Sequence, residues 1–129
     1  MPKLKHIHPF YLVIIIISAN FVVQILAPES LQLLRYQNAE VSNGEWWRLI
    51  SANFTHSNWN HWGLNMLGLL LIDFLFQPLI SLKLRSFLFS FCIVVNVLFI
   101  HIFLTIYWYV GLSGALHGYL FGAALLSIN

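Results

Sequence analysis

The stretch YVGLSGALHGYLFGAALL, residues 109 to 126, places a serine and a histidine in an otherwise apolar run. Gly111 and Gly114 flank Ser113, and because neither has a Cβ atom, another backbone or a substrate could approach the serine hydroxyl closely. If a helix begins here, its free N–H groups would favour a developing oxyanion. The residue types therefore fit nucleophilic catalysis by a serine.

The same stretch also permits a purely structural interpretation. Gly114, Gly118 and Gly122 recur every four residues and would share one face of a helix. Such a face of small residues is the usual device for close helix packing in lipid. GLSG alone leaves both interpretations open, and helix packing is the commoner use.

A serine nucleophile needs a base that takes its proton, and His117 is the nearest histidine in the sequence. Ser113 and His117 are four residues apart and would share a helix face. Neighbours on one helix point in the same direction, whereas the base must approach the hydroxyl from beside the substrate carbonyl. We therefore expect His117 to pack or to bond a neighbouring helix, and the base to come from another helix.

A second pair of polar residues, His61 and Asn65 in HWGLN, would also share a helix face. Both side chains can donate hydrogen bonds, and two donors aimed at one point make an oxyanion hole. Alternatively, they hold helices together in the membrane, which contributes about 0.6 to 2 kcal/mol each. A metal site at His56 and His61 is disfavoured, because no HExxH motif or cysteine pair accompanies them. We expect no cofactor.

Other polar residues have structural interpretations. In the segment EWWRL, Trp47 fits the headgroup level of a membrane, and Arg48 would bond loop carbonyls or lipid phosphates. Asp73 lies in an apolar run and could reach Lys83 or Arg85. These residues are therefore expected to fix helices and loops.

The composition indicates a membrane protein. Of 129 residues, 60% are hydrophobic and 8% are charged, whereas a soluble domain has roughly 25% charged residues. At this length we expect one domain, residues 1–129, in contact with the lipid bilayer. The net charge of +2 is too small and dispersed to suggest nucleic acid, and a single cysteine, Cys92, cannot form an intrachain disulfide.

A membrane-spanning helix needs about 20 mostly apolar residues. The sequence predicts four such helices, at about residues 9–27, 59–76, 86–107 and 109–128. A polar loop over residues 28–58 joins the first two, and the turn between the last two is tight. The expected fold is therefore an all-α membrane bundle.

Lysine and arginine near the span ends predict the orientation. Lys3 and Lys5 precede the first span, and Lys83 and Arg85 separate the second from the third, so we expect these ends in the cytoplasm. The second span then descends from the outer face and the fourth begins there. This topology brings the serine of GLSG to the same depth as the histidine and asparagine of HWGLN.

Taken together, these residues resemble the rhomboid family of intramembrane serine proteases. The matching pieces occur in order: Trp47 and Arg48 in the first outer loop, His56 before the second helix, HWGLNM fitting HxxxN, and GLSG opening the fourth helix. The continuation GLSGALHG resembles the bacterial rhombosortase branch. The resemblance extends from about Gly44 to Gly122.

The resemblance implies an endopeptidase of the bacterial inner membrane, multi-pass, that cleaves a transmembrane protein substrate near the outer face. Ser113 would be the nucleophile, and His61 and Asn65 would help its backbone N–H to hold the oxyanion. Structural residues near the site would be Gly111, Gly114, Gly118, Gly122, Trp47, Arg48 and His117.

The family fold has six core helices, and its general base is a histidine on the sixth. Only four helices are predicted in residues 1–129, so we expect an N-terminal portion that lacks this histidine and is inactive alone. Two alternatives remain open. One is a non-catalytic rhomboid-like protein that binds single-span clients, and the other is a plain helical membrane protein whose glycines and histidines only pack.

The predicted topology can be tested with single cysteines in a Cys92→Ala background. Asn38→Cys should react with a membrane-impermeant maleimide added from outside, because the charge asymmetry places residues 28–58 on that side. Ser81→Cys should be protected in intact cells. Labelling at Ser81 in place of Asn38 would overturn the orientation.

Overall fold

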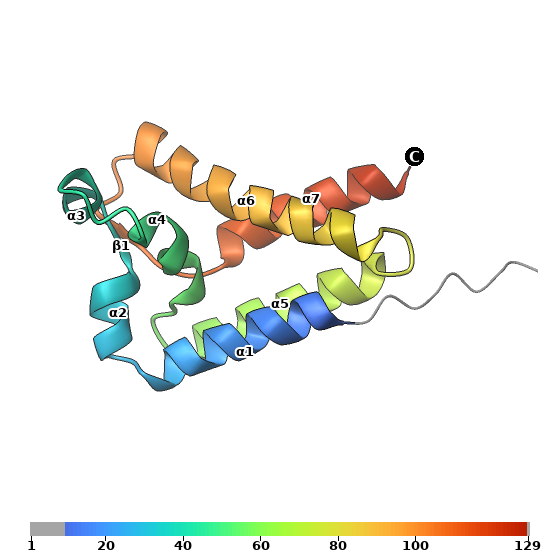
Figure 1. Ribbon diagram of the computed structural model, residues 1–129, viewed down its shortest axis with the longest axis horizontal. Helices are drawn as coiled ribbons and strands as arrows, with labels where there is room; N and C mark the ends of the chain where they lie inside the picture. Colours follow the sequence, from blue (N-terminus) through green and yellow to red (C-terminus); the bar gives the residue numbers. More distant parts are fainter. Residues whose placement is uncertain (1–9, 129) are drawn as a thin grey trace, which may run out of the picture.

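A computed structural model describes residues 10–128, which are mostly helical (Figure 1). The elements are α1 (Tyr11–Ile25), α2 (Glu29–Leu34), β1 (Tyr36–Gln37), α3 (Asn38–Ser42), α4 (Arg48–Ser51), the 3-10 helix η1 (Ala52–Phe54), α5 (Trp59–Phe76), α6 (Leu82–Phe103), β2 (Trp108–Tyr109) and α7 (Ser113–Ser127). Four long helices extend along the molecule, and α2, α3 and α4 gather at one end (Figure 1). The cytoplasmic placement expected from Lys3 and Lys5 falls on residues outside the described range.

Helix α6 begins and ends elsewhere than the apolar pattern predicts. α6 starts at Leu82, four residues earlier than expected, because the Ser81 side chain caps it by accepting from the Leu84 N–H at 3.3 Å. It ends at Phe103, since Leu104 is extended. By contrast, α5 covers Trp59–Phe76, the same residues as the second predicted span.

The expected start of the last helix at residue 109 is wrong, because Tyr109 lies in a strand. β1 and β2 pair antiparallel, with Tyr36 opposite Tyr109 and Gln37 opposite Trp108. The chain then turns through Gly111, and α7 begins at Ser113. The fold is therefore not entirely α-helical, although the strand pair is short.

By length and composition, one helix of the described part, α6, can cross a membrane. α1 is apolar but has 15 residues, or about 22 Å at 1.5 Å per residue, against the roughly 30 Å of the hydrocarbon core. The expectation of four spans is therefore met by this criterion for one helix only.

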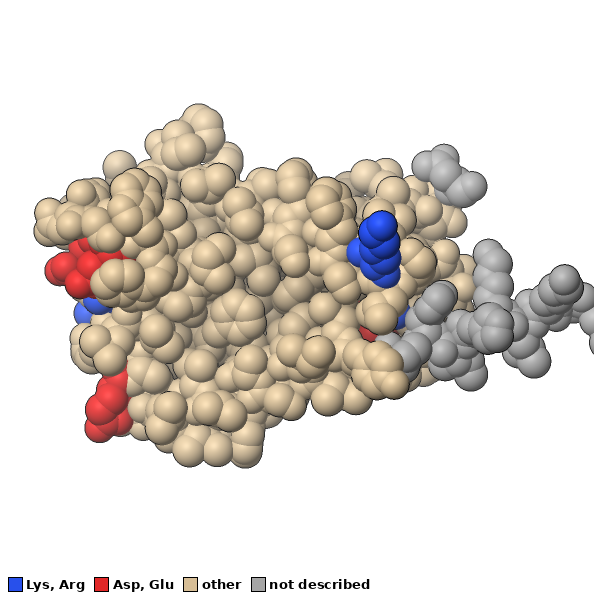
Figure 2. Space-filling view, viewed as in Figure 1, with Lys and Arg blue, Asp and Glu red and all other residues tan. Residues whose placement is uncertain are grey.

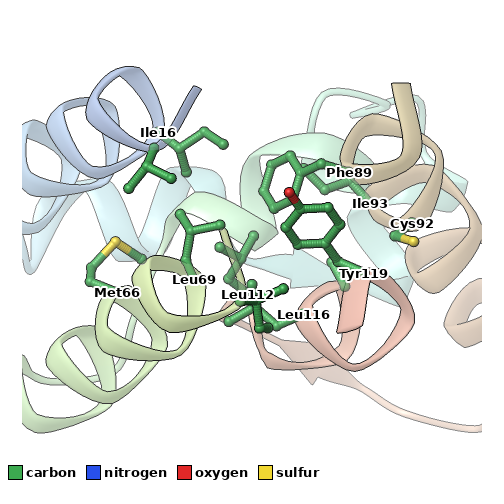
Figure 3. Packing of buried hydrophobic residues seen from close by; sticks show 12 residues of the cluster. Ile16, Met66, Leu69, Phe89, Cys92, Ile93, Leu112, Leu116 and Tyr119 are labelled. Carbon is green, nitrogen blue, oxygen red and sulfur yellow. The ribbon is translucent and has the colours of Figure 1, made fainter. Parts of the chain in front are cut away.

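α7 packs between α5 and α6 and contacts both, while α1 packs against α5 (Figure 1). One apolar core joins these four helices, as Figure 3 shows for Ile16, Leu69, Phe89 and Tyr119. A second cluster, formed by Tyr36, Val41, Ala52, Val97 and Ile100, lies beneath the loop elements at one end. The loop thus has a core of its own on α6.

The glycine face of α7 lies against α6. A Cβ atom added at Gly118 would lie 3.1 Å from the Sγ of Cys92, and one at Gly122 would lie 2.7 Å from Cδ1 of Leu88. Residues without side chains therefore allow the close approach of these two helices, as the four-residue spacing suggests.

A polar cluster lies between α5, α6 and α7. The Asp73 carboxylate pairs with Arg85, the second of the two partners that the sequence offers. The Tyr119 hydroxyl donates to the same carboxylate oxygen at 3.0 Å. All three side chains are fully buried, as ionisable groups at membrane depth usually are.

Arg48 holds the loop between α1 and α5 together. Its side chain is buried, and its Nη1 donates to the carbonyls of Gln32 at 3.0 Å and Arg35 at 2.9 Å. Its Nε also pairs with Glu45. Of the two expected partners, loop carbonyls and lipid phosphates, the structure shows the loop carbonyls.

Arg48→Ala should loosen this loop, because two partly buried carbonyls lose their donor, which costs about 1 to 3 kcal/mol. We expect faster cleavage of residues 28–58 by an externally added protease. Gln32→Ala is the matched control, because it keeps the carbonyl that Arg48 binds. Equal cleavage of both variants would contradict this role for Arg48.

Candidate functional site

The turn before α7 is built around Gly111. Its φ of +103° lies in a region that side chains rarely permit. Its N–H donates to the carbonyl of Ala52 at 2.9 Å, which ties the turn to η1 in the loop. Two residues later the chain enters α7, so this turn determines where Ser113 lies.

Two side chains of α5 lie against this turn. A Cβ atom on Gly111 would lie 2.7 Å from the His61 ring and 3.3 Å from Nδ2 of Asn65. The start of α5 is capped by Asn58, which accepts from the His61 N–H at 2.8 Å. The Ser57 hydroxyl is 3.2 Å from Nδ1 of His61, so the ring is held on one edge while its other edge faces Gly111.

Ser113 and Asn65 line one groove between α5 and α7. The groove has a volume of about 240 Å³. Its lining is completed by Leu64, Gly68, Ile72, Leu116, His117 and Leu120. The polar side chains are the serine, the amide and the imidazole, and the remaining lining is apolar. The groove therefore offers an apolar segment room beside Ser113.

His117 is held by the backbone of its own helix. Its Nδ1 lies 2.7 Å from the Ser113 carbonyl oxygen. A carbonyl only accepts hydrogen bonds, so Nδ1 carries the proton in this arrangement. The ring is thus bonded to the serine backbone and not to the serine hydroxyl.

His56 lies behind His61. Their ring centroids are 5.0 Å apart at an interplanar angle of 76°, and His56 is buried with both ring nitrogens unpartnered among residues 10–128. Burial and, secondarily, the His61 ring lower the pKa of His56 to about 4. At neutral pH His56 is therefore an uncharged ring that supports His61.

No group of three or more metal-ligating side chains occurs in the part of the chain that the structure describes. His56 and His61 pack edge to face, with ring centroids 5.0 Å apart.

Tyr109 also lies near the site, although no pattern in the sequence indicates it. Its hydroxyl accepts from the Gly114 N–H and from Nδ2 of Asn96, both at 3.4 Å. A Cβ atom on Gly114 would also collide with the Asn96 amide. Because Tyr109 was expected inside a helix, only the strand pairing could have revealed its position.

Other residues expected near the site lie away from the groove. Trp47 is exposed, and its Nε1 donates to the Leu33 carbonyl at 3.3 Å within the loop. Gly118 and Gly122 face α6. The structure therefore brings together Ser113, His61 and Asn65 around the turn at Gly111, with His117 in the same groove. Trp47 and Arg48 bond within the loop, and Gly118 and Gly122 pack against α6.

A family model described as Rhomboid domain matches residues 43–129. This range includes α5, α6, α7 and every residue that lines the groove. Rhomboid domains define a class of helical membrane proteins that are typically serine proteases. The match covers more than half of the chain, which therefore belongs to the rhomboid family. No curated protein and no solved structure matches it.

Gly111→Ala should destabilise the protein by about 1 to 3 kcal/mol, because the added Cβ atom is strained at this φ and meets the His61 ring. The measurement is thermal unfolding in detergent. Gly63→Ala is the matched control, since a Cβ atom there meets nothing within 4 Å and alanine favours the helix. Equal unfolding temperatures for both variants would contradict the close approach at Gly111.

Proposed function

We propose that this chain carries the nucleophile and oxyanion-binding half of an intramembrane serine endopeptidase that cleaves transmembrane substrates near the outer face. The observation that carries the proposal is the groove in which Ser113 opens α7 beside Asn65, with the His61 ring on the glycine of the preceding turn. Family membership supports it, because rhomboid proteins are typically serine proteases.

In this proposal the Ser113 hydroxyl attacks a substrate carbonyl and loses its proton to a base. The carbonyl oxygen becomes an oxyanion that accepts from Asn65, His61 and the backbone N–H groups at the start of α7. Nδ2 of Asn65 is buried and has no partner within residues 10–128. An oxyanion would satisfy this donor, which is costly to leave unpaired.

The proposed base is a histidine that residues 10–128 do not supply. Of the histidines in that range, His117 bonds the serine carbonyl and His101 lies 2.9 Å from the Tyr36 hydroxyl. His56 and His61 face each other across the start of α5. The resemblance to rhomboid proteases assigns the base to a sixth core helix.

We further propose that α1, α5, α6 and α7 all cross the membrane. The charged side chains visible in Figure 2 gather at the two ends of the molecule, and a broad band without them lies between. Exposed leucine, isoleucine, valine and phenylalanine side chains occur on all four helices. The segment GLSGALHG fits a bacterial inner-membrane protein of the rhombosortase branch. In this proposal the N-terminus lies in the cytoplasm.

A second candidate is a non-catalytic rhomboid-like protein that binds single-span clients in the same groove. It is favoured by one observation: across residues 10–128, no histidine ring is hydrogen-bonded to the Ser113 hydroxyl. Without a base, a serine hydroxyl remains a weak nucleophile. Chemical reactivity of Ser113 discriminates between the two candidates.

The test is labelling of Ser113 by a fluorophosphonate probe. Residues 1–129 expressed alone should not label, because members of a catalytic unit act together and loss of the base costs orders of magnitude. A fusion of this chain to the last two core helices of an active rhomboid protease, which carry the base histidine, should label.

Two variants of the fusion provide the controls. Ser113→Ala should abolish labelling, and Asn65→Ala should slow it about 10²-fold to 10³-fold if Asn65 binds the oxyanion. A folded fusion that does not label would favour the client-binding candidate. Labelling of residues 1–129 alone that is lost on His117→Ala would show that His117 is the base.

A further inference from the structure

The cluster of Asp73, Arg85 and Tyr119 has no part in the chemistry proposed above. Asp73 lies about two helical turns from Asn65 along α5, and the cluster connects the helix that carries Ser113 to the helix that carries His61 and Asn65. Oδ1 of Asp73 accepts from the Tyr119 hydroxyl at 3.0 Å and pairs with Nη1 of Arg85. Nε of Arg85 donates to the Ile80 carbonyl at 3.2 Å, which anchors the guanidinium at the start of α6.

The spacing of these residues gives α5 and α7 two points of contact. On α5, Asp73 follows Asn65 by eight residues, which is about 12 Å along the axis. On α7, Tyr119 follows Ser113 by six residues, or about 9 Å. One contact is therefore at the groove and the other is at the buried carboxylate.

We propose that Asp73 and Tyr119 are positioning residues that set the rotation and depth of α7, and thereby place Ser113 opposite Asn65. In lipid, apolar side chains give helices little reason to prefer one register, so hydrogen bonds and close packing decide it. The contacts along the groove are mostly apolar, and Gly68 meets Leu116 there without polar complementarity. The Tyr119 hydroxyl supplies the directional contact that these surfaces lack.

The carboxylate is itself held in place. Asp73 is fully buried and paired with a fully buried Arg85, so either group alone would be a costly charge. Arg85 thus holds the Asp73 carboxylate in its orientation toward Tyr119 of α7. Tyr119 also packs edge to face on Phe89, with ring centroids 5.5 Å apart, a contact that phenylalanine can keep.

Tyr119→Phe removes only the hydroxyl and is the test variant. Tyr36→Phe is its matched control, because Tyr36 is equally buried and its hydroxyl bonds His101 in the other core cluster. Two cysteine pairs in a Cys92→Ala background report the register of α7 against α5 through disulfide cross-linking. The first pair, Gly68→Cys with Leu116→Cys, reports the native register. The second pair, Gly68→Cys with Leu120→Cys, lies one turn further along α7 and reports a shifted register.

Oxidative cross-linking of both reporters in membranes measures the register without any need for catalysis. We expect Tyr119→Phe to lower the ratio of native to shifted cross-link about threefold or more, and Tyr36→Phe to leave it unchanged. An unchanged ratio in Tyr119→Phe would overturn the proposal, as would the same change in both variants.

The effect of the α7 register on Ser113 is measured in the fusion. This part of the inference rests on the proposed protease function. We expect Tyr119→Phe to slow fluorophosphonate labelling about tenfold or more, since displacement of a nucleophile by 1 Å can cost about 10²-fold. Normal labelling despite a shifted register would overturn the positioning of Ser113. If the parent fusion does not label, the protease function fails, and the cross-link ratio still decides whether Asp73 and Tyr119 set α7.

Discussion

The close approach of the His61 ring to the backbone of Gly111 is the contact on which the rest of the arrangement depends. No side chain could occupy the position of a Cβ atom there, since it would lie 2.7 Å from the ring. Because the turn lies directly on α5, the first residue of α7 enters the same groove as Asn65. A larger residue at 111 would push the start of α7 away from α5.

Contacts from three directions hold this turn and helix in place. The Ala52 carbonyl accepts from the Gly111 N–H, so the loop organised by Arg48 is tied to the turn. The glycines of α7 let α6 approach from the other side. The buried pair of Asp73 and Arg85 holds the far end of the three helices. In lipid, where apolar association is weak, such close contacts and polar bonds must carry specificity.

Local patterns in the sequence predicted much of this site. The spacing in HWGLN placed His61 and Asn65 on one helix face, and the glycines around Ser113 indicated a helix terminus with free N–H groups. The glycines that recur every four residues likewise indicated a packing face on α7, and this face lies against α6. These features depend on residues within one or two helical turns of each other.

The features that the sequence did not reveal depend on distant partners. The apolar pattern predicts a loop at Lys83 and Arg85, which lie in the first turn of α6, because the burial of Arg85 requires Asp73 on another helix. The same pattern predicts a helix at Tyr109, because the strand that pairs with it lies more than 70 positions earlier. Apolar composition identifies a helix, but the place where it begins is decided by caps and tertiary pairing.

An experimental structure of the fusion with a phosphonate bound covalently to Ser113 would show directly whether α5 supplies the donors to the oxyanion. We expect one phosphonate oxygen to lie about 2.7 to 3.1 Å from Nδ2 of Asn65 and within hydrogen-bond reach of the His61 ring. A phosphonate oxygen that points away from α5, with Asn65 and His61 bonded only to other protein groups, would contradict this expectation.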